Sequence, residues 1–298
     1  MLWQNDNAVI IGKYQNTIAE INASFVKEHG IKVARRLSGG GAVYHDMGNL
    51  NFTYIINSSE PNFDFSIFCE PMIRALRSLG VAAEQSGRND ITIDGKKCSG
   101  NAQYCRKGRL MHHGTLLYDS DLDMLAHALN VTADKIESKG IPSARSRVTN
   151  IKPYMRKPAT IETFRDCLKS FLFQEHEGRM TEYGLNNAEL EAAKTLRDMK
   201  YAGWDWNYGQ SPDSNIRKKR RIEGCGTIEV YMDVEKFTII RITFHGDYFG
   251  HEDSALLAEQ LIGCPLDEEA LRRRLSGLSI SSYFHNISAD QLISLLLC

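Results

Sequence analysis

The stretch that decides the fold is RRLSGGGAVYHDMGN, residues 35–49. Apolar residues precede it and the β-forming residues 50–56 follow it, so its three glycines should lie between two strands rather than at the end of a helix. Glycine accepts φ > 0 and lets main-chain N–H groups approach an anion closely. Arg35 and Arg36 beside it supply planar, charged groups for a phosphate or carboxylate. The spacings of a dinucleotide fingerprint and of a P-loop are absent, so the stretch is either an ordinary loop or a backbone opened for another anionic ligand.

A second informative stretch is residues 89–100, where Asp94-Gly95 predicts a two-residue hairpin turn. The predicted pairs are Ile93 with Lys96, Thr92 with Lys97, Ile91 with Cys98, and Asp90 with Ser99. Because cross-strand partners share a face and neighbours alternate, Lys97 should share a polar face with Asp90, whereas Cys98 should point into the core. Lys96 is then solvated at the turn. From the residues alone, surface charges are the more common role for two lysines beside a hairpin turn.

The composition excludes several classes of protein. With 298 residues and 42% hydrophobic content, the chain is long enough for a large domain and a small one. A formal net charge of -1 gives no overall basic field, so nothing favours nucleic acid or an anionic membrane as a partner. No targeting segment opens the chain, and no apolar run approaches the roughly 18 residues of a membrane span. Seven cysteines without a C-x-x-C pair argue against a disulfide framework and a zinc site, so we expect free thiols in a cytoplasmic protein.

Hydrophobic periodicity predicts the other elements of the first two thirds of the chain. Strands are expected over residues 7–12 and 110–118, the second with His112 and His113 on opposite faces. A structural role for this pair outweighs a chemical one, and no neighbouring residues suggest a metal cage. The predicted helices are 17–30, ending in glycine; 65–80, with Pro71 in its first turn or at a kink; 121–130; 160–174; and 187–199, with Leu190, Ala193 and Leu196 inward.

The composition changes after residue 209, and we place a domain boundary there. The basic run Arg217–Arg221 is expected to be a solvated strand edge that prevents aggregation, rather than an anion patch. Alternating apolar residues beyond it predict a strand pair, which three short helices follow. Asp267 should cap one helix, and Ser288 with Gln291 should form the capping box of the last.

Six strings of this chain resemble the signature of the lipoate-protein ligase family. They are R-R-x-S-G-G-G-A-V-x-H-D-x-G-N at 35–49, G-R-N-D at 87–90, D-G-K-K-C-S-G-N-A at 94–102, H-H-G at 112–114, R-S-R-V-T-N at 145–150 and W-D-W-N at 204–207. They span most of the chain in the family's order. The resemblance implies an α+β protein: a mixed-sheet, lipoate/biotin-ligase-like catalytic domain over residues 1–210 and a small α+β C-terminal accessory domain over 211–298. Family members usually have a further strand and helix upstream, so the catalytic domain looks N-terminally short.

The resemblance also implies an activity, namely ATP-dependent activation of lipoate to lipoyl-AMP and transfer of the lipoyl group to a lysine of an acceptor lipoyl domain. It further implies ATP, Mg²⁺ and lipoate as ligands. The implied acceptors are 2-oxoacid dehydrogenase subunits and the glycine-cleavage H protein. Lys97 matches the family's catalytic lysine, which also contacts lipoate. His113 matches a lipoate contact, and Asp90 a contact to the adenylate or its Mg²⁺. The residues implied for binding ATP and lipoyl-AMP are Arg36, Gly39, Gly40, Gly41, Ala42, Val43, Tyr44, Asn49, Asp90 and Lys97.

Three alternative functions are weighed against this one. A biotin ligase would carry a G-R-G-R-x-G-type loop, which the sequence lacks. An octanoyl or lipoyl transferase would work through a cysteine thioester without ATP, and Cys98 beside Lys97 keeps this alternative open. A lipoate-binding module that depends on a partner chain is the non-enzymatic alternative.

Overall fold

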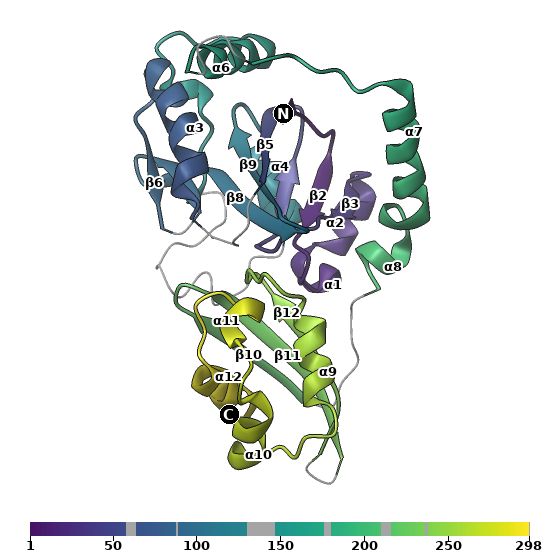
Figure 1. Ribbon diagram of the computed structural model, residues 1–298. Coiled ribbons are helices and arrows are strands. Elements are labelled where there is room, and N and C mark those ends of the chain that lie inside the picture. The colour runs from purple at the N-terminus through teal and green to yellow at the C-terminus, as the bar shows by residue number, and fades with distance from the viewer. Residues whose placement is uncertain are drawn as a thin grey trace.

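The computed structural model of the chain describes residues 1–57, 64–87, 89–129, 147–175, 180–209, 216–235 and 238–297, except the side chain of Ser24. Figure 1 shows a larger N-terminal body with two sheets and a C-terminal domain built on a third. Helices and sheets occur in both, which confirms the predicted α+β class. Among the described residues, no helix has the length and apolar character needed to span a bilayer.

The larger sheet of the N-terminal body has six antiparallel strands in the order β1-β5-β9-β8-β7-β6. Their bounds are Leu2–Trp3 (β1), Asn49–Asn57 (β5), Ala83–Ser86 (β6), Asp90–Ile93 (β7), Lys96–Arg106 (β8) and Arg109–Leu117 (β9). The predicted strand over 110–118 is β9. Its successive residues His112 and His113 pair with Tyr54 and Thr53, so they point to opposite faces as predicted.

A smaller mixed sheet has the order β3-β2-β4, with β2 parallel to β3 and antiparallel to β4. Its strands are Ala8–Ile11 (β2), Lys32–Arg35 (β3) and Val43–His45 (β4). The three glycines lie in the connection from β3 to β4, between two strands as predicted. The helical segments in the described part of the body are Thr17–Glu20 (α1), Ala23–Glu28 (α2), Ser66–Ser78 (α3), Leu122–Ala128 (α4), Lys152–Tyr154 (η2), Ile161–Glu175 (α6), Asn187–Leu196 (α7), Arg197–Tyr201 (η3) and Trp204–Asn207 (α8).

Helix α3 covers one face of the six-stranded sheet, and α6 lies beside it (Figure 1), joined by an ion pair of 2.9 Å between Arg74 and Glu175. Leu50 and Phe52 of β5 meet Met72 of α3 in the core between them. The helices predicted at 65–80 and 160–174 are therefore confirmed. Pro71 lies in the interior of α3 rather than in its first turn.

The single helix predicted over residues 17–30 is wrong, because the chain forms α1 and α2 instead. Ile21 leaves the helix to make a β-bridge with Leu129, just after α4. The side chain of Asn22 then accepts a hydrogen bond from the amide of Phe25 and caps the new helix. The predicted glycine stop is right, since Gly30 has a φ of 59°.

The predicted hairpin of β7 and β8 forms around Asp94-Gly95, but only half of its predicted register is right. The confirmed pairs are Ile93 with Lys96 and Thr92 with Lys97. A β-bulge then shifts the register by one residue, and the observed pairs are Ile91 with Ser99 and Asp90 with Gly100. Cys98 is the additional residue in the bulge. Ser99, predicted on the polar face, is therefore fully buried.

The helix predicted over 187–199 exists as α7 and the π-helical turn η3, but its predicted inward face is wrong. Leu190 is 42% exposed and Leu196 58% exposed, and Ala193 is exposed as well. Figure 1 shows α7 standing at the side of the body, after the extended segment 180–186. Its apolar stripe is uncovered because no described element packs on it.

The C-terminal domain packs helices on one face of the antiparallel sheet β10-β11-β12 (Figure 1). Its elements are Ile216–Ile222 (β10), Gly226–Glu235 (β11), Thr238–Gly246 (β12), Ser254–Leu261 (α9), Glu268–Leu275 (α10), Ile280–Tyr283 (α11) and Ala289–Leu297 (α12). The described part of this domain has four helices where three were predicted, since α11 is an extra single turn. Asp267 caps α10, and Ser288 with Gln291 closes the capping box of α12, both as predicted. The basic run lies on the edge strand β10 as predicted, but it is only partly solvated, since Lys218, Lys219 and Arg220 are half-buried.

Candidate functional site

Residues 36–42 form a tight loop, here called the glycine loop, between β3 and β4. Gly40 has a φ of 87°, a conformation that residues with a Cβ rarely adopt. The loop lies directly on Gly12, where an added Cβ would stand 1.9 Å from the carbonyl oxygen of Gly40. The amide of Lys13 donates to the carbonyl oxygen of Ser38 at 2.9 Å. The protein therefore holds the main chain of the loop in place by itself.

Of the residues predicted to bind ATP, Gly39 to Ala42 lie in the glycine loop, and Val43 and Tyr44 lie in β4. Tyr44 is buried and its hydroxyl donates to Asn7 Oδ1 at 3.0 Å. Burial raises the pKa of this hydroxyl to about 12. The side chain of Tyr44 is thus part of the smaller sheet's packing, and only its main chain lies next to the loop.

The Arg36 guanidinium holds the glycine loop from inside. Its Nη2 donates to the carbonyl oxygens of Gly39 at 2.7 Å and Gly41 at 2.8 Å. Its Nη1 donates to the carbonyl oxygen of Ile10 at 3.0 Å and its Nε to Ser38 Oγ at 3.2 Å. These bonds use four of the five N–H donors of the side chain. Burial lowers the pKa of Arg36 to about 10, so the group stays charged at neutral pH. A direct contact of Arg36 with ATP stays a prediction.

Arg35 points the other way and is buried. Its guanidinium donates to the carbonyl oxygens of Gly12 and Gln15 at 2.9 and 2.6 Å, so it does not present the fork to an anion that the sequence suggested. Its amide donates to Asn207 Oδ1 at 2.8 Å, and its carbonyl oxygen accepts from Trp206 Nε1 at 2.9 Å. The W-D-W-N string, which forms α8, is thereby fixed behind the glycine loop.

His113 reaches the glycine loop from β9, with its Nε2 at 2.6 Å from Ser38 Oγ. That hydroxyl also accepts from Arg36 Nε, so it lies between the guanidinium and the imidazole ring. Burial, followed by the charge of Arg36, lowers the pKa of His113 to about 3, which keeps the ring neutral at pH 7. The predicted lipoate contact thus lies beside the predicted nucleotide loop. Ser38 was missed by the sequence analysis, although it stands inside the motif.

Lys97 and Asp90 form the second half of the site, with Nζ of the lysine 2.8 Å from Oδ1 of the aspartate. This ion pair confirms the shared face that the hairpin predicted, and Lys96 is exposed, also as predicted. Lys97 lies across Gly100, where an added Cβ would stand 2.8 Å from both Cε and Nζ. The amide of Thr149 donates to the carbonyl oxygen of Lys97 at 2.9 Å, so residues 147–150 of the R-S-R-V-T-N string run alongside. The first part of that string, 145–146, lies outside the described residues.

Strand β9 connects the two halves, since it carries His113 and pairs with both β8 and β5. On β5, the Nδ2 of Asn49 donates to Asn51 Oδ1 at 3.0 Å, and both side chains are buried. Asn49 Oδ1 and Asn51 Nδ2 have no hydrogen-bond partner among the described residues. Buried polar atoms are costly unless a water or a ligand satisfies them. Asn49 therefore fits the ligand contact that the sequence predicts.

The predicted metal contact, Asp90, stands with a lysine rather than with other metal ligands. Within the described ranges, no group of three or more His, Cys, Asp or Glu side chains is placed to hold a metal ion. Mg²⁺ usually keeps several waters and binds through one or two carboxylates plus substrate phosphates. The donor set at Asp90 therefore suits Mg²⁺ that arrives with ATP rather than a resident ion.

Cys98 is fully buried, and its Sγ donates to the carbonyl oxygen of Ile91 at 3.4 Å. Burial raises the pKa of this thiol to about 12, so it carries almost no thiolate at neutral pH. The predicted burial is confirmed, although a bulge rather than the predicted pairing produces it. The six cysteines of the described residues are all free thiols, and the seventh, Cys298, lies outside them.

Two aromatic residues of the C-terminal domain touch the glycine loop, and no motif pointed to them. The amide of Gly40 donates to the carbonyl oxygen of Tyr248 at a long 3.4 Å. A Cβ at Gly39 would stand 2.2 Å from that oxygen, and one at Gly40 would stand 3.3 Å from Cζ of Phe249. Phe249 is buried in the core of the N-terminal body, with its ring 5.6 Å from that of Phe65. The loop is thus closed on one side by the other domain.

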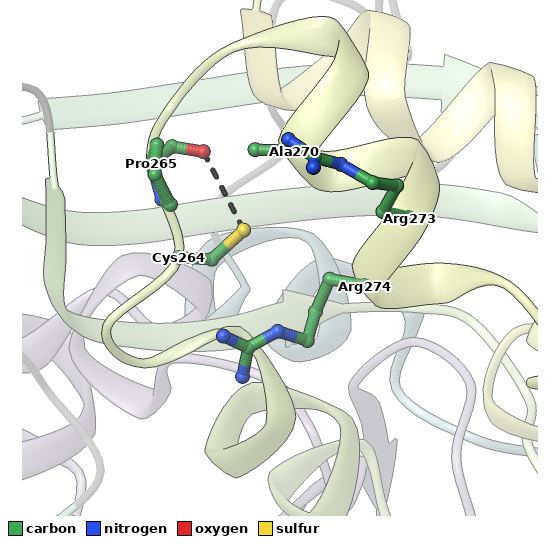
Figure 2. A pocket seen from close by; sticks show the side chains of 5 residues that line it. All are labelled: Cys264, Pro265, Ala270, Arg273 and Arg274. Carbon is green, nitrogen blue, oxygen red and sulfur yellow. Dashed lines mark hydrogen bonds between the residues drawn. The ribbon is translucent and has the colours of Figure 1, made fainter.

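A hollow of about 400 Å³ lies elsewhere, in the C-terminal domain (Figure 2). It is lined by Cys264, Pro265, Ala270, Arg273 and Arg274. The Sγ of Cys264 donates to the carbonyl oxygen of Pro265 at 3.5 Å, the bond drawn in Figure 2. None of the predicted site residues lines this hollow.

Comparison with known proteins identifies the family. The model of the lipoyl protein ligase A/B catalytic domain matches residues 1–173, and the model of the bacterial lipoate protein ligase C-terminus matches residues 211–296. A curated relative, the lipoate-protein ligase LplJ of Bacillus subtilis, is 44% identical over 298 residues, which cover 99% of this chain and 90% of the relative.

Solved structures agree with the family models. LipL1 of P. falciparum in complex with lipoate is 27% identical, with a TM-score of 0.75 and coverage of 99% of this chain and 85% of that one. A lipoate-protein ligase A bound with ATP is 31% identical, with a TM-score of 0.61 and coverage of 70% and 85%. A bi-partite lipoate protein ligase, studied with its E2 lipoyl domain, from Thermoplasma acidophilum is 33% identical, with a TM-score of 0.63 and coverage of 72% and 85%. From its glycine loop to its C-terminal domain, the chain belongs to the lipoate-protein ligase family.

Proposed function

We propose that this protein is an ATP-dependent ligase that activates lipoate to lipoyl-AMP, releases pyrophosphate and transfers the lipoyl group to a lysine of an acceptor lipoyl domain. Family membership and relatives solved with lipoate and with ATP support this proposal. The observation in this chain that carries it is the ion pair of Lys97 and Asp90, in which the lysine side chain lies over Gly100. The adjacent strand β9 carries His113, which contacts the glycine loop.

The glycine loop is proposed to hold the phosphate side of ATP and of the adenylate. The loop main chain is already held by Arg36, so few degrees of freedom are lost when a phosphate binds. The charge of Arg36 next to the loop offsets phosphate charge even without a direct contact. The amide of Gly40 faces Tyr248 through a long bond that a phosphate oxygen would have to replace.

Lys97 is proposed to act at the reacting centre in both steps. In the first step a lipoate carboxylate oxygen bonds to the α-phosphorus while the bond to pyrophosphate breaks, so negative charge builds on phosphoryl oxygens. In the second, the acceptor amine attacks the acyl carbon and AMP leaves, so charge builds on the carbonyl oxygen. A fixed positive donor at such a place lowers the barrier by about 3 kcal/mol. Asp90 holds the lysine in one orientation.

Mg²⁺ bound with ATP would be held by Asp90 together with the phosphates, and it would supply further positive charge there. Asn49 offers its buried Oδ1 on β5 as a polar contact to the bound nucleotide. His113, neutral and beside the loop, is proposed to contact the acyl chain of lipoate.

The domain boundary and the cellular setting are part of the same proposal. We assign residues 1–210 to the catalytic domain and 211–298 to the accessory domain, which is consistent with the residues matched by the two family models. The acceptors are proposed to be 2-oxoacid dehydrogenase subunits and the glycine-cleavage H protein. Free thiols at the described cysteines fit a reducing compartment, so we place the activity in the cytoplasm.

Incubation with ATP, lipoate and an apo lipoyl domain tests the function, with the mass of the acceptor as the readout. We expect a gain of one lipoyl group that requires ATP. Lys97→Met should abolish pyrophosphate release, whereas Lys96→Met, at the exposed neighbour on the same strand, should leave it largely intact. Lipoylation without ATP, or equal pyrophosphate release by both variants, would refute the proposal.

A further inference from the structure

A chain of buried polar side chains runs behind the Lys97 hairpin, on the face of the sheet that points away from the glycine loop. It begins at His112, which is fully buried and stacks on Phe68 with ring centroids 4.7 Å apart. Both ring nitrogens have a partner in spite of the aromatic surroundings. Nδ1 lies 3.1 Å from Gln103 Nε2, and Nε2 lies 3.3 Å from Asn101 Oδ1.

The direction of these hydrogen bonds follows from the other partners of the two side-chain amides. Gln103 Nε2 also lies 3.1 Å from the carbonyl oxygen of Asp64, and Asn101 Nδ2 lies 3.0 Å from that of Asn89. A carbonyl oxygen can only accept, so both amide nitrogens are donors and both orientations are settled. Gln103 therefore donates to His112 Nδ1, and His112 carries its proton on Nε2 and donates it to Asn101 Oδ1. The ring is neutral, and burial keeps it so by lowering its pKa to about 3.

Asn101 fastens the base of the hairpin. Its main-chain amide and its Nδ2 both donate to the carbonyl oxygen of Asn89, at 2.9 and 3.0 Å, and Asn89 Nδ2 donates back to the carbonyl oxygen of Asn101 at 2.6 Å. Asn101 Nδ2 also lies 3.3 Å from Ser99 Oγ, on the residue that follows the β-bulge. Asn89 immediately precedes Asp90. Asn101 therefore holds both strands at the places from which Asp90 and Lys97 project.

The glycine opposite Asn101 shows that the sheet is built around this side chain. Gly114 pairs with Asn101 across β8 and β9. A Cβ there would stand 2.2 Å from Asn101 Oδ1 and 2.6 Å from Cζ of Phe52. Any side chain at this position would push Asn101 away from His112. Within the H-H-G string, His112 thus supplies the hydrogen-bond donor, and Gly114, two residues later, leaves room for the acceptor Asn101 Oδ1.

We propose that His112 is a positioning residue of the ligase reaction: through its hydrogen bond to Asn101 it sets the place of the β7–β8 hairpin and so of the Lys97 ammonium. The inference rests on the proposed function, in which Lys97 acts on the reacting atoms. His112 itself touches no substrate. It lies on the opposite face of β9 from His113, so the two adjacent histidines serve different halves of the site.

The test compares His112→Leu with His112→Gln in the full-length protein. Leucine fills the apolar site without a donor, whereas glutamine keeps an amide N–H near the position of Nε2. We expect His112→Leu to lower kcat of ATP–pyrophosphate exchange on the order of 10- to 100-fold, the effect of displacing a catalytic group by about 1 Å. The KM values for ATP and lipoate should change by a smaller factor than kcat, because the glycine loop is held from the other face. His112→Gln should recover most of the lost kcat.

Controls separate this inference from the function it rests on. Activity per folded molecule is measured with circular dichroism as the check on folding, and Lys96→Met serves as an unaffected variant of the same hairpin. If Lys97→Met is active, the proposed function fails. If Lys97→Met is inactive but folded His112→Leu keeps its kcat, or if leucine and glutamine variants are equally impaired, this inference alone fails. Should His112→Leu not fold, Asn101→Ala must show the same loss of kcat, and an unchanged kcat there overturns the proposal.

Discussion

Three histidines of the N-terminal body, with His45 and His112 buried and His113 half-buried, should make it sensitive to acid. Burial lowers the pKa values of His45, His112 and His113 from 6.5 to about 3, and the nearby charge of Arg36 adds to the effect at His45 and His113. Between pH 6.5 and pH 3 the unfolded chain therefore binds more protons than the folded one, so stability falls as the pH falls. At pH 5.0, 1.5 units below the unfolded value, each ring costs about 2 kcal/mol at ~1.36 kcal/mol per unit. The three together cost about 6 kcal/mol, comparable with the whole stability of many domains.

Urea unfolding followed by circular dichroism from pH 7.5 to pH 5.0 measures this effect. Between pH 6 and pH 5 we expect these three rings to lower the free energy of unfolding by about 4 kcal/mol, an uptake of about three protons. His245 of the C-terminal domain, whose pKa burial lowers to about 4, should add about one more. His112→Gln removes one titrating ring and should flatten that slope by about one proton. A slope below one proton over the same interval would show that these rings titrate normally in the folded protein, and the reasoning from their burial would be refuted.

Three further substitutions probe single contacts. Gly39→Ala should destabilise the protein by about 1–3 kcal/mol, because its Cβ would stand 2.2 Å from the carbonyl oxygen of Tyr248; an unchanged urea midpoint would contradict the domain contact. Cys98→Ser should cost ~1 kcal/mol for a hydroxyl at an apolar site and leave ATP-dependent lipoylation running; an acyl-thioester trapped on the protein and lost in this variant would favour the transferase instead. Ser38→Ala removes the hydroxyl between Arg36 and His113 and should raise the KM for ATP several-fold while costing about 1–3 kcal/mol of stability; an unaltered KM in the exchange assay would mean that this hydroxyl does not shape the loop.

Local turn chemistry was enough to predict which of two adjacent lysines pairs with Asp90. The Asp94-Gly95 turn sets the register next to it, and the correct pairs are those nearest the turn. The bulge at Cys98 could not be predicted in the same way. It sits where Asn101 is held from β9, and β9 meets β8 only in the folded protein.

Hydrophobic periodicity predicted where most helices lie, but not what packs against their apolar faces. It marks which face of a segment is apolar, but it does not say what covers that face. In the segment 17–30 the pairing of Ile21 with Leu129 breaks a pattern that would suit one helix. In α7 the pattern is real, yet Leu196 is 58% exposed because the helix stands off the body. The structural role of Arg36 could not be predicted either. One of the carbonyl oxygens that its side chain binds belongs to Ile10, which is on another strand and comes close only in the folded protein.

Tyr248 and Phe249 are consecutive residues whose side chains are buried in different cores, the first in the C-terminal domain and the second in the N-terminal body. Any movement that separates the two domains must therefore withdraw a phenyl ring from a closed apolar site. Burying such a side chain contributes about 1.5–3 kcal/mol, so this contact alone would limit the separated arrangement to roughly 1–10% of the molecules. The burial of the Phe249 side chain in the N-terminal core therefore limits how often the two domains separate.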